Sequence, residues 1–271
     1  MRPFELLLFS TDPLLIDVAV AGGVGGIIVD WENVGKRSRQ SGADTQINQD
    51  TVEDLRRVRA ATKAPVVCRI NGPGPEIGVE IEAAIGAGAD EILVPMVRSV
   101  EEVEGVLELV RSRCGVGILV ETRTAVAIAK ELALLPLRRV YVGLNDLAIE
   151  RRTSTIFDAL VDGTVEKIRR LFEMPFGFGG LTLPEAGDPI PCRLLVAELA
   201  RLSCDFSFLR RSFHRDIQHR DSLVEIPRIL QALDRAAKRS PEAIARDRDD
   251  LERAVVAWRT QAPTAAAAPQ R

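Results

Sequence analysis

Short apolar runs rich in valine, isoleucine and leucine recur along the chain at intervals of roughly 20 to 35 residues. They are almost continuously hydrophobic, with little alternation of apolar and polar positions. Runs of this kind are typical of strands that are buried on both faces of a parallel sheet. The pattern predicts strands at 5–10, 26–32, 65–71, 91–97, 116–122, 139–145, 176–183 and 205–212.

Amphipathic segments with apolar residues three and four positions apart separate these runs, which is the spacing of a helix with one buried face. The predicted helices are DTVEDLRRVRAAT, PEIGVEIEAAIGAG, SVEEVEGVLELVRSR, TAVAIAKELALL, IFDALVDGTVEKIRRLF and IPCRLLVAELARLS. Eight strand-then-helix units in a chain of 271 residues fit a closed (β/α)8 TIM barrel better than an open doubly wound sheet.

The domain boundaries follow from a change in composition near residue 239. Residues 1–238 are predicted to form the barrel, residues 239–261 an additional C-terminal helix, and residues 262–271 a disordered tail. The additional helix is highly charged but carries Leu251, Val255 and Trp258 on one side. Because such a helix on a complete barrel needs a surface to cover its apolar side, we expect a homo-oligomer.

Composition and charge exclude several classes of partner. The chain is 46% hydrophobic, 28% charged and carries a net charge of −3, which does not favour a nucleic-acid surface. Asp12, Pro13 and Asp17 interrupt the apolar N-terminus before it reaches membrane or signal-peptide length. The four cysteines form no CxxC pair. We therefore expect a cytoplasmic protein that binds a small molecule, and neither a membrane nor a nucleic acid.

Polar side chains gather where the predicted strands end, and in a parallel barrel these ends surround the active site. The residues at these positions are Asp30, Glu32, Arg69, Asn71, Glu121, Asp146, Thr182, Arg210 and Arg211. Taken singly, each has a structural explanation, since Glu121–Thr122 could start a helix and Asn145–Asp146 could form a turn or cap. Taken together, several carboxylates and an arginine at one barrel mouth indicate a site.

The acidic residues at these strand ends indicate a divalent metal. Glu121 and Asp146 end neighbouring strands, so their carboxylates are expected to converge, and like charges so placed need a cation between them. Oxygen ligands with room for water and substrate suit Mg²⁺ or Mn²⁺. Asp30 and Glu32 share the same side-chain direction on their strand, so both are expected to face the mouth.

The last two strands predict a second anionic pocket, because barrels often hold phosphate there with glycine-rich backbone and cations. Gly179, Arg210 and Arg211 are its candidates. The alternative that the two arginines are divided between a helix-facing salt bridge and solvent stays open. A basic loop, 36–39, either closes over the substrate or is solvated. His214 and His219 are expected to lie on a surface helix instead of binding a metal.

Five of these segments resemble the pyruvate-type class II aldolase and citrate lyase β-subunit family. The matching stretches are IIVDWE, PVVCRIN, GADEILVPMV, ILVETRTA and VYVGLNDLA. The resemblance covers 26–147 well and continues more loosely to 216. Each fragment alone is a weak signal, and the combination of ET on one strand with GxxDL on the next, in register with an upstream arginine strand, is moderately specific.

The resemblance implies a barrel in which Glu121 and Asp146 bind a divalent metal that chelates an oxo acid such as pyruvate or oxaloacetate. Arg69 then holds the oxygen that becomes an enolate, and Asp30 supports metal-bound water. Asn33 and Asn71 are further candidates for substrate binding. The chemistry agrees, because making or breaking a carbon–carbon bond beside a carbonyl builds negative charge on its oxygen.

The chain departs from the aldolase pattern at two positions. Sugar-acid aldolases of this kind carry a histidine after the strand glutamate, where this chain has Asn33, and a glutamine where it has Leu119. Glu32, a metal-bound hydroxide or a group on the substrate is left for proton transfer. The expected function is a metal-dependent carbon–carbon lyase or synthase that acts on a 2-oxo acid. The alternatives are a citrate-lyase-like enzyme acting on an acyl-CoA and a non-catalytic barrel that binds an oxo acid.

Overall fold

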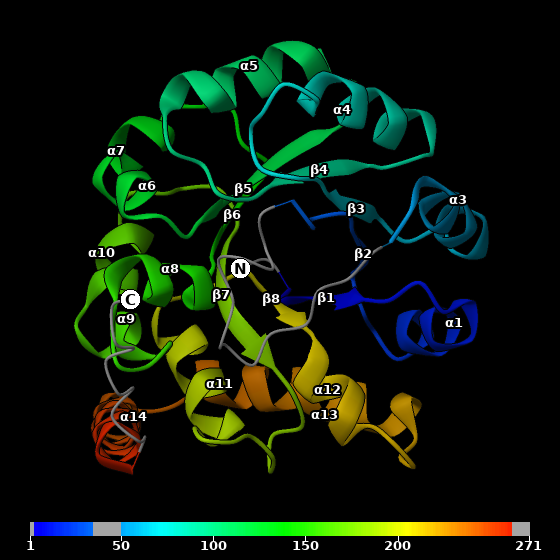
Figure 1. Ribbon diagram of the computed structural model, residues 1–271. Helices are drawn as coiled ribbons and strands as arrows, with labels where there is room; N and C mark the ends of the chain where they lie inside the picture. The colour runs from blue at the N-terminus through cyan, green and yellow to red at the C-terminus, as the bar shows by residue number, and fades with distance from the viewer. Residues whose placement is uncertain (1–2, 35–49, 262–271) are drawn as a thin grey trace, which may run out of the picture.

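The computed structural model describes residues 3–34 and 50–261, and within them eight parallel strands close into a barrel. Each strand pairs with the next in sequence, and the last pairs with the first, so the predicted TIM barrel is confirmed (Figure 1). The strands are β1 Glu5–Phe9, β2 Gly26–Asp30, β3 Val66–Arg69, β4 Glu91–Val94, β5 Gly115–Val120, β6 Arg139–Val142, β7 Phe176–Leu181 and β8 Phe206–Leu209.

Helices surround the strands on the outside, as Figure 1 shows. The strands end one to three residues before their predicted limits, because the chain leaves the hydrogen-bonded ladder where the mouth begins. The helices are α1 Pro13–Ala21, α3 Val52–Ala61, α4 Ile77–Gly86, α5 Val100–Val110, α6 Arg123–Ala127, α7 Ala129–Leu132, α8 Leu144–Arg151, α9 Asp158–Val161, α10 Thr164–Arg169, α11 Cys192–Arg201, α12 Arg211–Asp216, α13 Ser222–Ala237 and α14 Pro241–Gln261.

Two segments that were each predicted as one helix form two helices instead. The segment 124–135 forms α6 and α7, which meet at Ile128, and the segment 156–172 forms α9 and α10. The second break lies at Gly163, which has the left-handed φ of 79° that favours glycine. Helices α1, α8, α12 and α13 lie outside the predicted segments. Asp12 and Pro13, which interrupt the apolar N-terminus, are the N-cap and first residue of α1.

The barrel interior is filled by an apolar cluster that is separate from the core between strands and helices. Its members are Leu7, Phe9, Ile28, Val67, Leu93, Leu119, Tyr141, Phe206 and Phe208. Side chains two positions apart on a strand point the same way. Residues two positions after members of this cluster therefore point into the barrel as well, and they form the next layer of side chains toward the carboxyl ends of the strands, at the mouth. Among them are Asp30, Arg69, Glu121 and Arg210.

The opposite end of the barrel is closed by buried ion pairs. Nε of Arg139 donates to both carboxylate oxygens of Glu91, at 2.8 and 2.9 Å, and Nη1 donates to Glu5 at 2.7 Å. The Arg139 guanidinium also lies 5.0 Å from the centre of the Phe206 ring. A side chain at Gly117 would place its Cβ 2.6 Å from a Glu91 oxygen, so glycine is needed there. The charges at this end are balanced within the protein.

Helix α14 packs on the same chain through the apolar side that the sequence analysis singled out. Leu251 and Val255 are fully buried. Arg248 pairs with the buried Glu198 of α11 at 2.7 Å and donates to the carbonyl of Leu160 in α9 at 3.0 Å. Helices α9 and α11 therefore cover this face, and the argument that it needs a partner subunit is wrong. The homo-oligomer itself stays a prediction.

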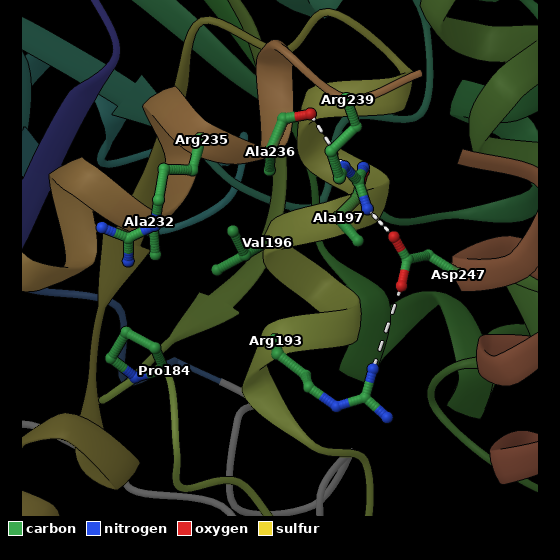
Figure 2. Close-up of a pocket in the computed structure, with 9 residues that line it drawn as sticks. All are labelled: Pro184, Arg193, Val196, Ala197, Ala232, Arg235, Ala236, Arg239 and Asp247. Atoms are coloured by element: carbon green, nitrogen blue, oxygen red, sulfur yellow. Dashed lines mark hydrogen bonds and ion pairs between the residues drawn. The ribbon is translucent and has the colours of Figure 1, made fainter. Parts of the chain in front are cut away.

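The start of α14 is held by a second ionic contact. Figure 2 shows Asp247 between Arg239 and Arg193, and the Arg193 contact measures 3.9 Å. Arg239 also donates to the carbonyls of Ala236 and Ala197, at 2.8 and 3.0 Å. A cavity of about 310 Å³ lies beside these residues, on the outside of the barrel between α11, α13 and α14. Among the described residues, no helix combines the length and apolar character needed to cross a membrane.

Replacing Glu91 tests the buried ion pairs. Glu91→Ala leaves the Arg139 charge buried without its main partner, so we expect the free energy of unfolding to fall by about 3–5 kcal/mol. Urea unfolding followed by circular dichroism measures this change. Glu53→Ala, which removes an exposed partner of Arg56, should leave the unfolding midpoint nearly unchanged. Equal losses in the two variants would contradict the role given to Glu91.

Candidate active site

Arg69 at the end of β3 is held by two carboxylates from the end of β2. Its Nε and Nη2 donate to the two oxygens of Asp30 at 2.7 and 2.6 Å, and Nη1 lies 3.2 Å from Glu32 Oε2. All three side chains are buried. Burial acts to lower the pKa of Arg69, but the charges of Asp30 and Glu32 override it and raise that pKa. The guanidinium is therefore permanently charged and fixed in orientation.

The alternating sequence Asp30-Trp31-Glu32 explains how β2 supplies both carboxylates. Asp30 and Glu32 contact Arg69, whereas Trp31 belongs to the outer core and its Nε1 donates to the carbonyl of Thr51 at 3.0 Å. The backbone N–H of Asp30 donates to Asp50 Oδ2 at 2.9 Å. The prediction that Asp30 and Glu32 share one direction is confirmed.

Asn71 holds the backbone that follows β2. Its Oδ1 accepts hydrogen bonds from the backbone N–H groups of Asn33 and Val34, both at 2.9 Å. Its Nδ2 donates to Glu80 of α4 at 2.7 Å. The Asn33 side chain is exposed. These bonds give Asn71 a positioning role, and contact of either asparagine with a substrate stays a prediction.

Glu121 is buried at the end of β5 and is oriented by the loop after β4. Its Oε1 accepts a hydrogen bond from the backbone N–H of Met96 at 2.9 Å. Met96 has a φ of 56°, a left-handed conformation that few non-glycine residues adopt and that often marks functional sites. The next residue, Thr122, caps α6 by accepting from the N–H of Ala125 at 2.9 Å. The helix-start explanation therefore applies to Thr122, while Glu121 faces the mouth.

Asp146 lies in the first turn of α8, directly after β6, and is also buried. Glycine at position 143 allows Glu121 to pass close to β6, because a Cβ there would overlap Glu121 Oε2. Burial raises the pKa of Glu121 to about 8, helped by the negative charges of Asp146 and Glu32. Glu121 and Asp146 are therefore close enough to repel each other.

This pair of carboxylates fits a hard divalent cation. Two buried oxygen donors of like charge are stabilised by a cation, and Mg²⁺ is commonly held by one or two carboxylates with water and substrate oxygens. Within residues 3–34 and 50–261, no group of three or more histidine, cysteine or acidic side chains forms a complete metal site. Asp30 and Glu32 are engaged with Arg69, so Glu121 and Asp146 are the two buried carboxylates at the mouth that could hold a metal.

The β7 side of the mouth is shaped by an irregularity in the strand. Pairing with β8 shifts between Gly177 and Gly180, and Gly179 has a φ of 64°. The Gly179 carbonyl accepts hydrogen bonds from the hydroxyls of Tyr141 and Ser207. The carbonyl of Gly179 is thus bound by the protein, and its part in an anionic pocket stays a prediction.

Neighbouring polar groups at this end have structural partners. Thr182 donates to Asp216 of α12 at 2.7 Å and is buried. The apolar Leu119 is a separate case. It stands where the aldolases have glutamine, and it packs in the apolar cluster inside the barrel.

Arg210 and Arg211 follow β8 but point to different places. The half-buried Arg210 guanidinium lies 4.8 Å from the centre of the Phe9 ring, and that of Arg69 lies 5.2 Å from the same ring. Arg211 is exposed and begins α12. It lines a cavity of about 550 Å³ at the mouth, between the ends of β1 and β8, with Phe9, Ser10, Thr11, Asp12, Leu15, Asp50, His214, Arg215 and Gln218.

His214 is the clearest difference from the surface position expected for it. It lies on a helix as expected, but it lines this cavity, and its Nε2 is 2.6 Å from the carbonyl oxygen of Phe9. Sequence reasoning assigned no role to Asp50, Met96 or Gly143, although Met96 and Gly143 lie in the matching stretches GADEILVPMV and VYVGLNDLA. Each acts on a residue distant in sequence, and a local pattern does not show such a contact. Lys36, Arg37 and Arg39 lie outside the described residues.

A closed parallel barrel with buried carboxylates and arginines at the carboxyl ends of its strands defines the class of (β/α)8 proteins that carry their active sites there. The profile of the HpcH/HpaI aldolase/citrate lyase family matches residues 5–158, and the chain belongs to this family. The resemblance seen in the sequence is thereby confirmed. The family is of the lyase and aldolase type, which supports an enzymatic function.

Two solved structures share the fold. The citrate synthase SbnG superposes with a TM-score of 0.55 at 18% identity, covering 80% of this chain and 89% of that one. RipC from Yersinia pestis also gives 0.55, at 14% identity, covering 89% of this chain and 98% of that one. At these identities the likeness concerns the fold alone. A search among curated proteins finds no match to the sequence.

The raised pKa of Glu121 predicts a pH dependence for the metal-free protein. Between the ordinary glutamate pKa of about 4.3 and about 8, the folded state holds a proton that the unfolded state releases. The contribution of Glu121 to the free energy of unfolding therefore decreases as the pH rises through this window. Urea unfolding with a chelator at several pH values measures it. Glu121→Gln should remove most of this decrease, and an identical pH profile in the variant would contradict the assignment.

Proposed function

We propose that this protein is a divalent-metal-dependent carbon–carbon lyase, of the aldolase type or working in the direction of condensation, that acts on a 2-oxo acid through an enolate. The observation that carries the proposal is the arrangement at the mouth. A buried, permanently charged guanidinium faces two buried carboxylates whose like charges call for a cation. Membership of the aldolase/citrate lyase family supports the reaction type.

Glu121 and Asp146 are the residues that would hold Mg²⁺ or Mn²⁺. A cation bound there supplies Lewis-acid polarisation of the carbonyl and carboxylate oxygens of an oxo acid. The Met96 N–H orients Glu121 through Oε1. This bond and the close approach to Gly143 fix the carboxylate before a ligand arrives.

Arg69 is the group on this chain that stabilises the developing oxyanion. Asp30 and Glu32 engage three of its N–H groups within the described part of the chain. Two of the five N–H donors of a guanidinium are then left for a substrate oxygen. Because the carboxylates fix the guanidinium plane, little reorganisation is needed when negative charge forms on that oxygen. We assign proton transfer to Glu32, the buried carboxylate whose Oε2 contacts Arg69.

Exchange of the methyl protons of pyruvate with solvent deuterium tests the proposal, because removal of a methyl proton forms the enolate through which the reaction passes in either direction. We expect the wild type to catalyse exchange with Mg²⁺ or Mn²⁺, as followed by proton NMR. Glu121→Ala and Asp146→Ala should abolish exchange and metal binding. Arg69→Ala should retain the metal and lower the exchange rate by a factor of about 10²–10³.

Glu131→Ala, on the exposed surface of α7, is the matched control and should behave as the wild type. Binding of pyruvate without proton exchange would instead indicate a non-catalytic oxo-acid-binding barrel. Exchange that persists in both carboxylate variants would rule out the metal-dependent mechanism.

Gly143→Ala tests the close approach between β6 and Glu121. The added Cβ overlaps Glu121 Oε2, so the carboxylate must move, and we expect a 10- to 100-fold weaker affinity for Mn²⁺. Isothermal titration calorimetry measures this affinity. Gly105→Ala, in α5 with nothing within 4 Å of the added carbon, is the matched glycine control and should bind Mn²⁺ normally. Normal affinity in Gly143→Ala would refute the steric argument.

A further inference from the structure

A cavity on the outer face of the barrel combines apolar and cationic side chains. It has a volume of about 310 Å³ and lies between α11, α13 and α14 (Figure 2). Its apolar lining consists of Pro184, Val196, Ala197, Ala232 and Ala236, and its charged lining of Arg193, Arg235, Arg239 and Asp247. Concave sites that are mostly apolar, with a few charged groups, are the usual form of small-molecule sites. The cavity therefore has the composition of a ligand site, and none of the candidate metal or oxyanion residues of the mouth lines it.

Positive charge is in excess around this cavity, because three arginines and one aspartate line it. Arg239 pairs with Asp247 and also donates to two backbone carbonyls. Arg193 approaches the same aspartate only to 3.9 Å and Asp250 only to 3.7 Å, and its side chain is 57% exposed. These distances are longer than an ordinary hydrogen bond, so the Arg193 guanidinium is available to a ligand.

Arg235 supplies a second available guanidinium. Within residues 3–34 and 50–261 it forms no ion pair, and the neighbouring Asp234 pairs with Lys238 at 2.6 Å instead. Arg239 lies four positions later and lines the same cavity, so the two positive charges repel each other there. A bound carboxylate would convert this repulsion into charge-assisted hydrogen bonds.

The apolar lining determines what kind of anion fits. Val196 and Ala236 are buried and Ala232 is half-buried, and none of them has a polar side-chain atom. A carbon chain placed on these side chains is removed from water, which favours binding. An inorganic anion such as phosphate gains nothing from them. The cavity therefore favours an anion with an apolar body.

We propose that the cavity between α11, α13 and α14 binds a small organic carboxylate with an apolar body, such as a short-chain fatty acid. Arg193 and Arg235 hold the carboxylate, and the carbon chain packs on Val196 and Ala232. Because the cavity lies on the outside of the barrel, this ligand is distinct from the substrate of the mouth. The inference goes beyond the proposed lyase function and does not depend on it.

Titrations followed by ligand-observed NMR test the proposal with hexanoate, hexanamide and acetate. We expect hexanoate to bind at least about 10-fold more tightly than hexanamide, which lacks the charge, and than acetate, which lacks the apolar body. Arg235→Gln should weaken hexanoate binding about 3- to 10-fold, and its combination with Arg193→Gln should weaken it further. Ala232→Phe should abolish binding, because the added ring fills the cavity.

Two variants outside the cavity serve as controls. Ala237→Phe places the same ring on the exposed side of α13, and Arg56→Gln removes an exposed arginine of α3. Both should bind hexanoate as the wild type does. Thermal unfolding followed by circular dichroism checks the fold of every variant. The arginine variants test the site even where Ala232→Phe does not fold.

Absence of hexanoate binding, equal affinity for hexanoate and hexanamide, or wild-type affinity in the double arginine variant overturns the inference. Displacement of hexanoate by pyruvate with Mg²⁺ places it at the mouth and overturns the inference as well. Association of two chains that Arg235→Gln weakens, measured by light scattering in a protein that does not bind hexanoate, would make the cavity a subunit interface instead. Absence of pyruvate proton exchange overturns only the lyase function.

Discussion

The neutralisation of Arg69 is the interaction on which the mouth of the barrel depends. A guanidinium buried at the end of β3 is stable only when carboxylates surround it, and Asp30 and Glu32 supply two. This requirement explains why a buried strand ends in acidic residues. It also means that both oxygens of Asp30 and one oxygen of Glu32 are engaged by a guanidinium within the protein.

The two ends of the barrel differ in how their charges are balanced. At the closed end, Arg139 is matched by Glu91 and Glu5, and the cluster is complete within the protein. At the mouth, Glu121 and Asp146 place negative charges together, while Arg210 adds a positive charge beside Arg69. Buried groups whose pKa values are perturbed by neighbouring charges are typical of functional sites.

Preorganisation at the mouth comes from the backbone as much as from the side chains. The left-handed conformation of Met96 directs an N–H at Glu121, and Gly143 leaves room for the same carboxylate. Tyr141 and Ser207 hold the irregular end of β7 through the carbonyl of Gly179. Each contact joins different strands or loops. Small changes in these positioning groups should therefore alter the geometry at Glu121 and at the β7 end.

The sequence by itself determined the barrel, the acidic end of β2 and the carboxylates that end β5 and follow β6, because hydrophobic periodicity and side-chain alternation are local properties of a chain. The resemblance to the aldolase/citrate lyase family was visible for the same reason, since its motifs are short and contiguous. Only the tertiary structure decided that Asp30 binds Arg69 through both oxygens, that Arg210 enters the mouth while Arg211 lines the neighbouring cavity, and that α14 covers its apolar side on its own barrel. These outcomes depend on contacts between residues far apart in sequence, which pack against one another only once the barrel has closed.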